Sequence, residues 1–267
     1  MTPSQTFKDS QVALLEHNFE YAQRHDECPV CHWDLKDEDY KKVYSYKGIE
    51  YPCPDNDYGH VMYLLAKRYW LSFIPLEYQM LLWEEFPYPE LAKDIENYIE
   101  NFKRIRLSGM GFTFWSETMG TGKTWAATHI LKELVKQGYD CHFALFMGMP
   151  SYYELDDPED RALKMRRIRE AEVLVLDDVK APFSEAQRNF FEDKMEQLLR
   201  ERLSSCFPTI VTSNLSSKEF ARHYPRCSSL LAAKNQEVEL RGTDWRQNSG
   251  WLTNQELYLQ GETRPIT

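Results

Sequence analysis

Several features are missing from this chain of 267 residues, and each absence excludes a class of protein. No apolar run approaches the ~20 residues of a membrane-spanning helix, and no N-terminal signal peptide is recognisable. The six cysteines do not indicate a disulfide framework, because the chain shows no sign of secretion and is long enough to bury a sizeable core. We therefore expect a cytoplasmic protein without a membrane partner.

Basic residues are scarce in the first part of the chain. Residues 1–100 contain 9 Lys and Arg against 19 Asp and Glu, whereas residues 101–267 contain 23 of each. An acidic surface repels nucleic acid, so the first part favours a protein partner. The balanced second part can still carry a local basic patch.

A strand, a glycine-containing loop and a helix are predicted between residues 111 and 137. Residues 111–116 are β-favouring and aromatic, residues 119–124 read MGTGKT, and apolar residues recur at helical spacing from 125 to 137. In a phosphate-binding loop, glycines let successive N–H groups point at an anion, and the next helix begins there with its positive end. The predicted nucleotide site comprises Met119, Gly120, Thr121, Gly122, Lys123, Thr124 and Trp125.

Two residues of this loop have expected roles in binding ATP. Lys123 is expected to reach the terminal phosphates and the Thr124 hydroxyl to hold Mg²⁺. The pattern G-x-x-x-x-G-K-[ST] has one departure, because Glu117 occupies the first glycine position. The alternative interpretation is a chance match in an ordinary turn between a strand and a helix.

Two later strands are predicted to end in polar residues, VLVLDD at 173–178 and PTIVTSN at 208–214. Asp177 is expected to coordinate Mg²⁺, and Asp178 to orient and activate the attacking water. Asn214 is expected to hold that water and sense the γ-phosphate, although a turn residue or helix N-cap is the alternative. Arg246, in RGTDWRQ, is positioned to reach the phosphates from the far side.

The remaining pattern predicts further helices and strands. Residues 61–106 are expected to be mostly helical and broken by Pro87 and Pro89, with their aromatic residues used for packing. A strand is expected at 140–146, an amphipathic helix at 184–204 with Ser184 as N-cap, and a last short strand at 237–240. The basic helix 161–170 is either a solvated surface or a contact for single-stranded nucleic acid.

A zinc site is predicted in the N-terminal region. Cys28 and Cys31 form a CxxC turn, and Cys53 and His60 follow, which completes a Cys₃His set for tetrahedral Zn²⁺. The fourth ligand stays open, with His32 and Asp55 as competitors. Free thiols are the alternative. A module this small needs a metal or a cross-link to be stable, which favours zinc.

The chain resembles the AAA+ ATPases of the bacterial replicative-helicase loader group, which includes DnaC, DnaI and the transposition helper IstB. The motifs that carry the resemblance are, in order, the phosphate loop, VLVLDD, VTSN and RGTDWR. The resemblance covers about residues 28–247. It implies an α/β fold: an AAA+ P-loop NTPase core, with a parallel sheet flanked by helices, and a small zinc-binding module. The implied organisation is a helicase-interacting zinc module at 1–62, a helical linker at 63–106, the ATPase domain at 107–250 and a tail at 251–267.

The resemblance also implies a function, namely ATP-dependent loading of a replicative ring helicase onto single-stranded DNA, with self-assembly through the ATPase domain. Asn214 and Arg246 look like the two sensor residues of that family. The family's arginine finger is harder to place, because Leu230 stands at its usual position and only Arg226 or Arg222 is near. The alternatives are an IstB-type transposition helper and a nucleotide-binding adaptor with little hydrolysis.

Overall fold

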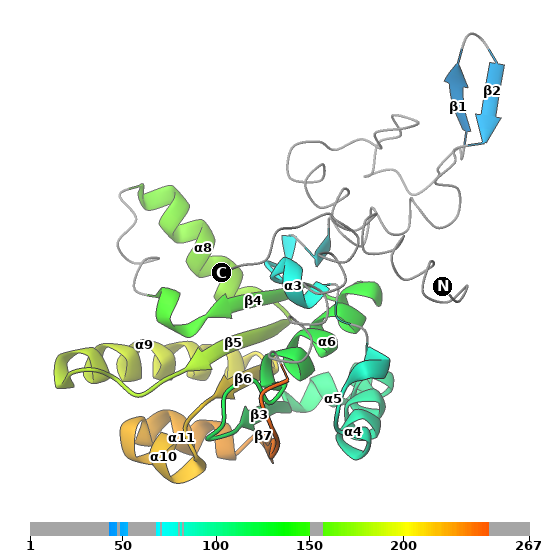
Figure 1. Cartoon of the computed structure of the whole chain (residues 1–267). Helices are drawn as coiled ribbons and strands as arrows, with labels where there is room; N and C mark the ends of the chain where they lie inside the picture. The colour runs from blue at the N-terminus through cyan, green and yellow to red at the C-terminus, as the bar shows by residue number, and fades with distance from the viewer. Residues whose placement is uncertain are drawn as a thin grey trace, which may run out of the picture.

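The computed structural model describes residues 43–46, 49–52, 68–69, 71–79, 81, 83–149 and 157–245. Its main body is a five-stranded parallel sheet with helices on both sides (Figure 1). Two strands outside this body, β1 (Val43–Tyr46) and β2 (Ile49–Pro52), pair antiparallel as a hairpin. The described helices include none that is long and apolar enough to cross a membrane.

The strands of the large sheet follow the order β4-β5-β6-β3-β7, and every neighbouring pair is parallel. They are β3 (Gly111–Trp115), β4 (Cys141–Leu145), β5 (Val173–Val179), β6 (Thr209–Ser213) and β7 (Asn235–Glu239). Because the strands are parallel, their carboxyl ends meet at one edge of the sheet. The segment after β6 therefore emerges between the segments after β3 and β5.

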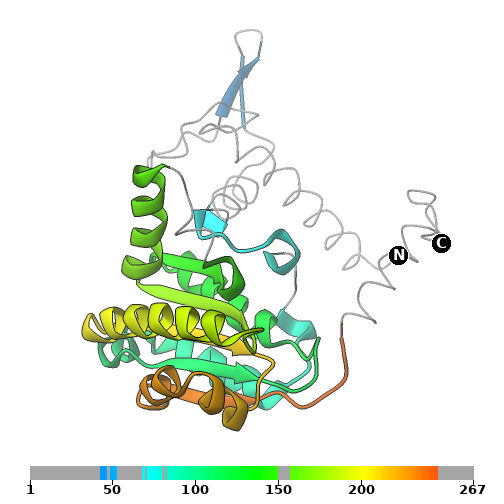
Figure 2. The same ribbon diagram turned by 90° about the vertical axis from the view of Figure 1, so that its left-hand side faces the viewer.

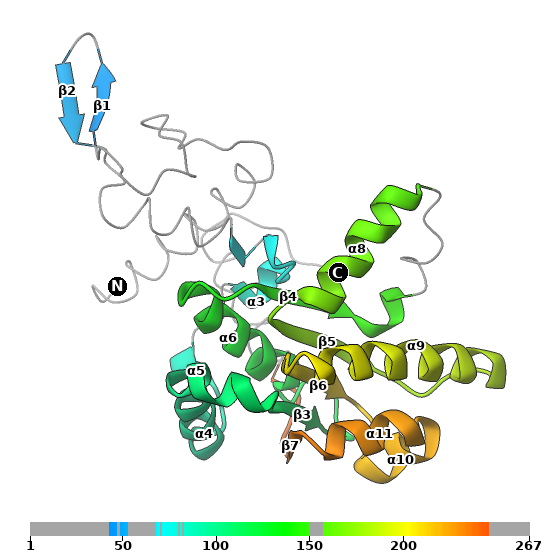
Figure 3. The ribbon, with the colours of Figure 1, turned by 180° about the vertical axis from the view of Figure 1, so that it is seen from behind.

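Helices cover both faces of the sheet. One face is covered by α4 (Pro89–Glu100), α5 (Phe102–Ile105) and α6 (Lys123–Lys136), and the other by α9 (Glu185–Ser204), α10 (Ser217–His223) and α11 (Pro225–Ala232) (Figures 1 and 3). Figure 2 shows α9 in yellow and α10 and α11 in orange in front of the sheet. Helix α8 (Pro158–Glu170) packs against α9 and β4.

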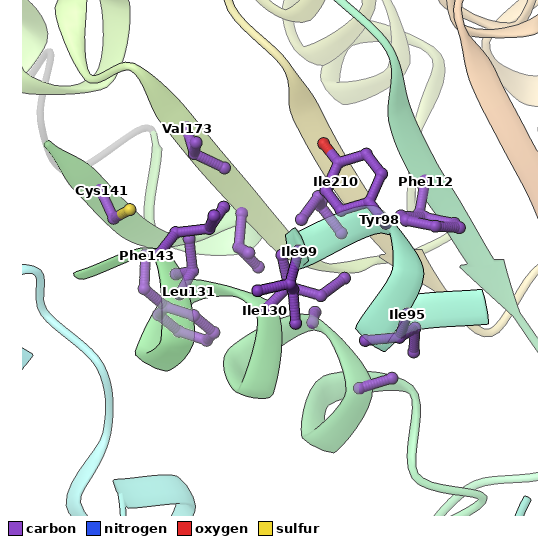
Figure 4. Close-up of a cluster of buried hydrophobic side chains, with 14 of the residues drawn as sticks. Ile95, Tyr98, Ile99, Phe112, Ile130, Leu131, Cys141, Phe143, Val173 and Ile210 are labelled. Carbon is purple, nitrogen blue, oxygen red and sulfur yellow. The ribbon is translucent and has the colours of Figure 1, made fainter. Parts of the chain in front are cut away.

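The central strands bury both of their faces. On β5, Val173 and Val175 belong to the hydrophobic cluster on the α6 side, whereas Leu174 and Leu176 belong to the cluster on the α9 side. Figure 4 shows the first cluster, with Val173 across from the apolar surface of α6. Each fully buried side chain of this size stabilises the fold by roughly 1.5–3 kcal/mol. This two-sided burial explains why the strand is an unbroken apolar run in the sequence.

A buried arginine forms hydrogen bonds with backbone and side-chain groups at the amino ends of the central strands. Arg202 is fully buried, and its Nε donates to the Thr209 hydroxyl at 2.9 Å. Its two terminal nitrogens donate to four backbone carbonyls at 2.7 to 3.1 Å, those of Ile168, Arg169, Ala171 and Pro208. Burial lowers the pKa of Arg202 to about 9. The guanidinium thus joins the end of α8, the start of β5, α9 and the start of β6.

Most of the predicted elements are confirmed, with boundaries that differ by a few residues. Helix α6 begins at Lys123 rather than Trp125, and β7 covers 235–239 rather than 237–240. Ser184 is the N-cap of α9, and its hydroxyl accepts the Gln187 N–H at 3.2 Å. Two helices, α10 and α11, were not predicted.

The described residues of the segment before α4 include α3 (Leu76–Gln79) and the 3₁₀ turn η1 (Trp83–Glu85), two short helical elements in a segment that was predicted to be mostly helical. Phe73 has φ 59°, a left-handed conformation that ends helical structure, and Pro75 follows. The predicted break at the two prolines is confirmed, because α4 begins with Pro89 in its first turn.

This segment docks onto the second half of α6. The buried Lys132 ammonium donates to the carbonyls of Tyr78, Gln79 and Leu81 at 3.1, 3.2 and 2.9 Å. One turn earlier, the His129 ring stacks on Trp83, with ring centroids 3.7 Å apart. Burial is the main reason why the pKa of Lys132 falls to about 8 and that of His129 to about 3.

Candidate nucleotide-binding site

The loop between β3 and α6 has the backbone that a phosphate-binding loop needs. Gly120 and Gly122 have φ of 70° and 91°, a left-handed conformation that only glycine adopts without strain. A Cβ on Gly120 would also overlap the carboxylate of Asp244, and the Trp245 N–H donates to the Gly120 carbonyl at 3.0 Å. The segment after β7 therefore lies against this loop.

Helix α6 begins directly after Gly122, so its unpaired N–H groups and positive end face the loop. Lys123 is only 8% exposed. Its ammonium donates to the Thr118 carbonyl at 3.1 Å and the Thr121 hydroxyl at 3.4 Å, both in the loop itself. A buried ammonium at a helix N-terminus is suited to an anion with several oxygens, such as a phosphate chain.

The loop and the acidic strand meet at one hydrogen bond. The Thr124 hydroxyl donates to Asp177 Oδ1 at 2.9 Å, although the two residues are 53 positions apart. Thr212 on the intervening strand β6 donates to the same oxygen at 2.6 Å. Burial raises the pKa of Asp177 to about 6, against the effect of these two hydroxyls. A threonine hydroxyl beside a buried carboxylate is a donor set that fits Mg²⁺.

Asp178 and Asn214 also lie together. A β-bulge between Leu176 and Val179 interrupts the pairing with β6, and Asp178 at this bulge has φ 61°. Bulges re-aim side chains, and left-handed non-glycine residues concentrate at functional sites. The Asn214 amide donates to Asp178 Oδ1 at 3.3 Å. The structure therefore brings together the residues predicted at the ends of β5 and β6.

Comparisons with known proteins bear on the fold. No family model and no curated protein matches the chain. The structure of DnaI matches with a TM-score of 0.53 at 20% identity, covering 64% of this chain and 94% of that one. The described core shares the fold of DnaI. The predicted resemblance to the helicase-loader group is thus confirmed at the level of fold.

Two further structures match at lower TM-scores. The DnaC helicase loader matches at 0.48 with 22% identity over 57% of this chain and 89% of that chain. AMPPCP-bound DnaA from Aquifex aeolicus matches at 0.46 with 17% identity over 65% of this chain and 52% of that chain. Of these three matches, only the one with DnaI has a TM-score that bears on the fold.

Two residues of this DnaI-like core take part in the site although the sequence analysis did not select them. The side chain of Thr212 links Asp177 to the Asp178 backbone N–H, which donates to its hydroxyl at 2.9 Å. Lys180 Nζ lies 2.6 Å from Asp178 Oδ2. A hydroxyl in a strand predicted to lie in the core was the available signal for Thr212, because buried polar groups need partners. Lys180 carries no comparable signal.

The candidate arginine finger has partners within the chain. Arg226 forms ion pairs with three carboxylates of α9, at 3.4 Å from Glu192, 2.6 Å from Asp193 and 2.6 Å from Glu196. It therefore holds α11 against α9 in this conformation, and its role as a finger stays a prediction. Arg246, the candidate second sensor, lies outside the described residues.

The basic helix α8 is partly neutralised by its own molecule. Arg166 pairs with Glu170 at 2.7 Å within the helix. Two more of its arginines pair with carboxylates elsewhere, Arg167 with Asp140 at 3.2 Å and Arg169 with Glu201 at 3.2 Å. The positive charge available to a nucleic acid is therefore smaller than the sequence count implies.

The predicted zinc ligands Cys28, Cys31, Cys53 and His60 lie outside the described residues. Among the residues that are described, no group of three or more His, Cys, Asp or Glu side chains is arranged to hold a metal ion. The zinc site therefore stays a prediction from the sequence.

Proposed function

We propose that this chain is an ATPase that assists DNA replication by loading a replicative ring helicase onto single-stranded DNA. The observation that carries the ATPase part is the hydrogen bond from Thr124 to Asp177 Oδ1, 2.9 Å long. It joins the phosphate-binding loop to the acidic strand, which is the juxtaposition that a nucleotide and its metal ion require.

In this proposal the loop residues hold the phosphates. The N–H groups at the start of α6 and the Lys123 ammonium bind the β- and γ-phosphates, which replace the Thr118 and Thr121 oxygens as acceptors of Lys123. Thr124 and Asp177 would hold Mg²⁺, which when bound supplies charge neutralisation at the phosphates. Arg246 contributes a further positive charge.

Asp178 and Asn214 act on the attacking water in this proposal. They lie at adjacent strand ends, and the amide already orients the carboxylate through a 3.3 Å hydrogen bond. Asp178 accepts a hydrogen bond from the water and takes its proton as the water oxygen bonds to the γ-phosphorus. The bond from this phosphorus to the bridging oxygen breaks, ADP leaves with that oxygen, and Asn214 fixes the position of the water.

The helicase and DNA partners are proposed from the fold, from the charge of the N-terminal region and from helix α8. The shared fold with DnaI and the acidic first 100 residues favour a protein partner bound by the N-terminal region. Helix α8 is the proposed contact for single-stranded DNA. Because its arginines pair with Asp140, Glu170 and Glu201, DNA phosphates must replace these carboxylates, and we expect weak, salt-sensitive binding.

The variant Lys123→Ala tests the ATPase assignment. We expect it to weaken ATP binding and to reduce DNA-stimulated turnover by about 100-fold or more, because a buried charged contact to the phosphates is lost. Calorimetry with ATP and a phosphate-release assay measure the two effects. The exposed Lys103→Ala in α5 is a control for loss of charge. Turnover that is unchanged in Lys123→Ala would reject the assignment.

A second assay tests the helicase-loading part. Pull-downs of candidate ring helicases with the full chain, in the presence and absence of ATP, should show capture that depends on nucleotide. Metal analysis of the same protein, compared with Cys28→Ser, checks the predicted zinc. Failure to capture any ring helicase while ATP turnover persists would leave an ATPase of another function.

A nucleotide-binding adaptor with little hydrolysis is the second candidate. It is favoured by Arg226, whose three ion pairs with α9 occupy the candidate finger, and by Glu117, which places a negative charge in the loop. Tight ATP binding with turnover at background level, with and without DNA, would favour the adaptor over the ATPase.

A further inference from the structure

The carboxylate of Asp178 is held from two sides. Lys180 Nζ lies 2.6 Å from Oδ2, and the Asn214 amide donates to Oδ1. We infer that Lys180 is a positioning residue that restrains Asp178 and keeps basal ATP turnover low. This inference rests on the proposed ATPase function and adds a residue that the phosphate-loop pattern does not contain.

The backbone beside this ion pair is fixed. The Ser213 hydroxyl donates to the Val179 carbonyl at 2.8 Å. The hydroxyl of the buried Tyr224, at the junction of α10 and α11, donates to the Lys180 carbonyl at 2.8 Å. The Lys180 side chain therefore starts from an anchored backbone two residues after Asp178.

The conformation of Asp178 shows why the pair can control it. The bulge and the φ of 61° turn this residue out of the regular alternation of β5. Its neighbour Asp177 is 6% exposed, whereas the Asp178 side chain is 36% exposed. A water molecule can therefore reach Asp178 more readily than Asp177, and Lys180 occupies the oxygen of Asp178 that Asn214 leaves open.

The restraint is reversible because the pair is open to solvent. The Lys180 side chain is 47% exposed, and exposed ion pairs are weak and screened by salt. Phosphate oxygens brought to this edge by the nucleotide compete for the same ammonium. When the Lys180 ammonium is paired with Asp178, it occupies Oδ2 of that carboxylate. When the pair is broken, Oδ2 can accept a hydrogen bond from the attacking water.

The variants Lys180→Met and Lys180→Arg test this inference. Methionine keeps the length of the side chain but cannot bind the carboxylate, so we expect kcat for ATP without DNA to rise roughly three- to fivefold while KM stays unchanged. Arginine restores the ion pair, and its kcat should equal that of the unchanged protein. Lys103→Met in α5 controls for the loss of one exposed positive charge.

The inference is overturned if the kcat of Lys180→Met equals or falls below that of the unchanged protein, or if Lys180→Arg is as fast as Lys180→Met. A merely structural role would alter the unfolding temperature or KM instead of kcat alone. Failure of the proposed function is recognised separately, by the absence of ATP binding in calorimetry or by turnover that Lys123→Ala does not reduce.

Discussion

The two halves of helix α6 carry buried polar side chains with different kinds of partner. At its start, Lys123 and Thr124 bond to groups of the phosphate-binding loop and to Asp177. Two turns later, Lys132 bonds to three backbone carbonyls of the segment before α4, and His129 stacks on Trp83. One helix therefore serves both a candidate ligand site and the attachment of the preceding segment.

Burial alone does not separate these two roles. Lys123 and Lys132 are 8% and 7% exposed, which is nearly the same. The two lysines differ in where their acceptors lie. Lys132 donates to carbonyls of the segment before α4, whereas Lys123 donates to oxygens of the glycine-containing loop directly before it. Lys132, whose hydrogen bonds join two distant segments, stabilises the fold. Lys123, which bonds to its own loop, can exchange those acceptors for a ligand.

The largest effect on stability is expected from Lys132→Met. The variant leaves three carbonyls, in one buried and two partly buried hydrogen bonds, without their charged donor and should lower the free energy of unfolding by about 3 to 5 kcal/mol. Chemical denaturation measures the loss. Lys136→Met, which removes an exposed pair with Glu133, is the matched control and should cost less than about 1 kcal/mol. If folded Lys132→Met loses ATP affinity as fully as Lys123→Ala, the two halves are not distinct.

The next largest effect is an increase in the free energy of unfolding, and it concerns Asp177, the partner of Thr124 at the start of α6. Asp177 has its pKa raised to about 6, so its ionised form at pH 7 opposes folding. Asp177→Asn should therefore stabilise the nucleotide-free protein at pH 7 by up to about 3 kcal/mol while it abolishes ATP turnover.

Thermal unfolding at two pH values checks this prediction. The group's folded pKa is raised, so its destabilising effect grows as pH rises from about 4 to about 6 and then stays constant. The difference between Asp177→Asn and the unchanged protein should accordingly shrink at pH 4.5. A lower unfolding temperature for the variant at pH 7 would contradict the argument.

A smaller effect is expected from His129→Phe in the second half. The pKa of His129 is lowered to about 3, so the neutral ring stabilises the fold above its ordinary pKa and this stability is lost as pH falls below about 6.5. Phenylalanine keeps the stack on Trp83 without titrating. Between pH 7 and pH 5 the variant should lose about 2 kcal/mol less stability than the unchanged protein.

The internal control for this comparison lies at higher pH. Between pH 7.5 and pH 8.5 His129 is neutral in both the folded and unfolded chain, so the two proteins should show parallel stabilities. An equal loss of stability in both proteins at pH 5 would show that burial does not hold this histidine neutral.

The sequence predicted the parts that depend on local pattern. The glycine loop, the apolar run of β5 and the Ser184 N-cap each need only a few neighbouring residues to be recognised, and the structure has a loop, a buried strand and a cap at these positions. The pattern also predicted two strands that end in polar residues, VLVLDD and PTIVTSN, and the structure pairs these strands as β5 and β6.

The missed parts depend on partners far along the chain. Lys132 reads as a polar position in an amphipathic helix, and its acceptors lie 51 to 54 positions earlier. Phe73 interrupts the segment before α4 with a left-handed φ of 59°, which no local pattern of apolar residues signals. Tertiary contacts decide such positions, so sequence periodicity cannot.

Several elements of the fold are connected through the single side chain of Arg202. Its guanidinium links α8, α9, β5 and β6 by hydrogen bonds, at the opposite end of the strands from the nucleotide site. Even lysine cannot replace it, because an ammonium lacks the planar fork that reaches five acceptors at once. Links spread over several residues would be lost one at a time under mutation, whereas these five hydrogen bonds are lost together when Arg202 alone is replaced, at a position remote from the nucleotide site.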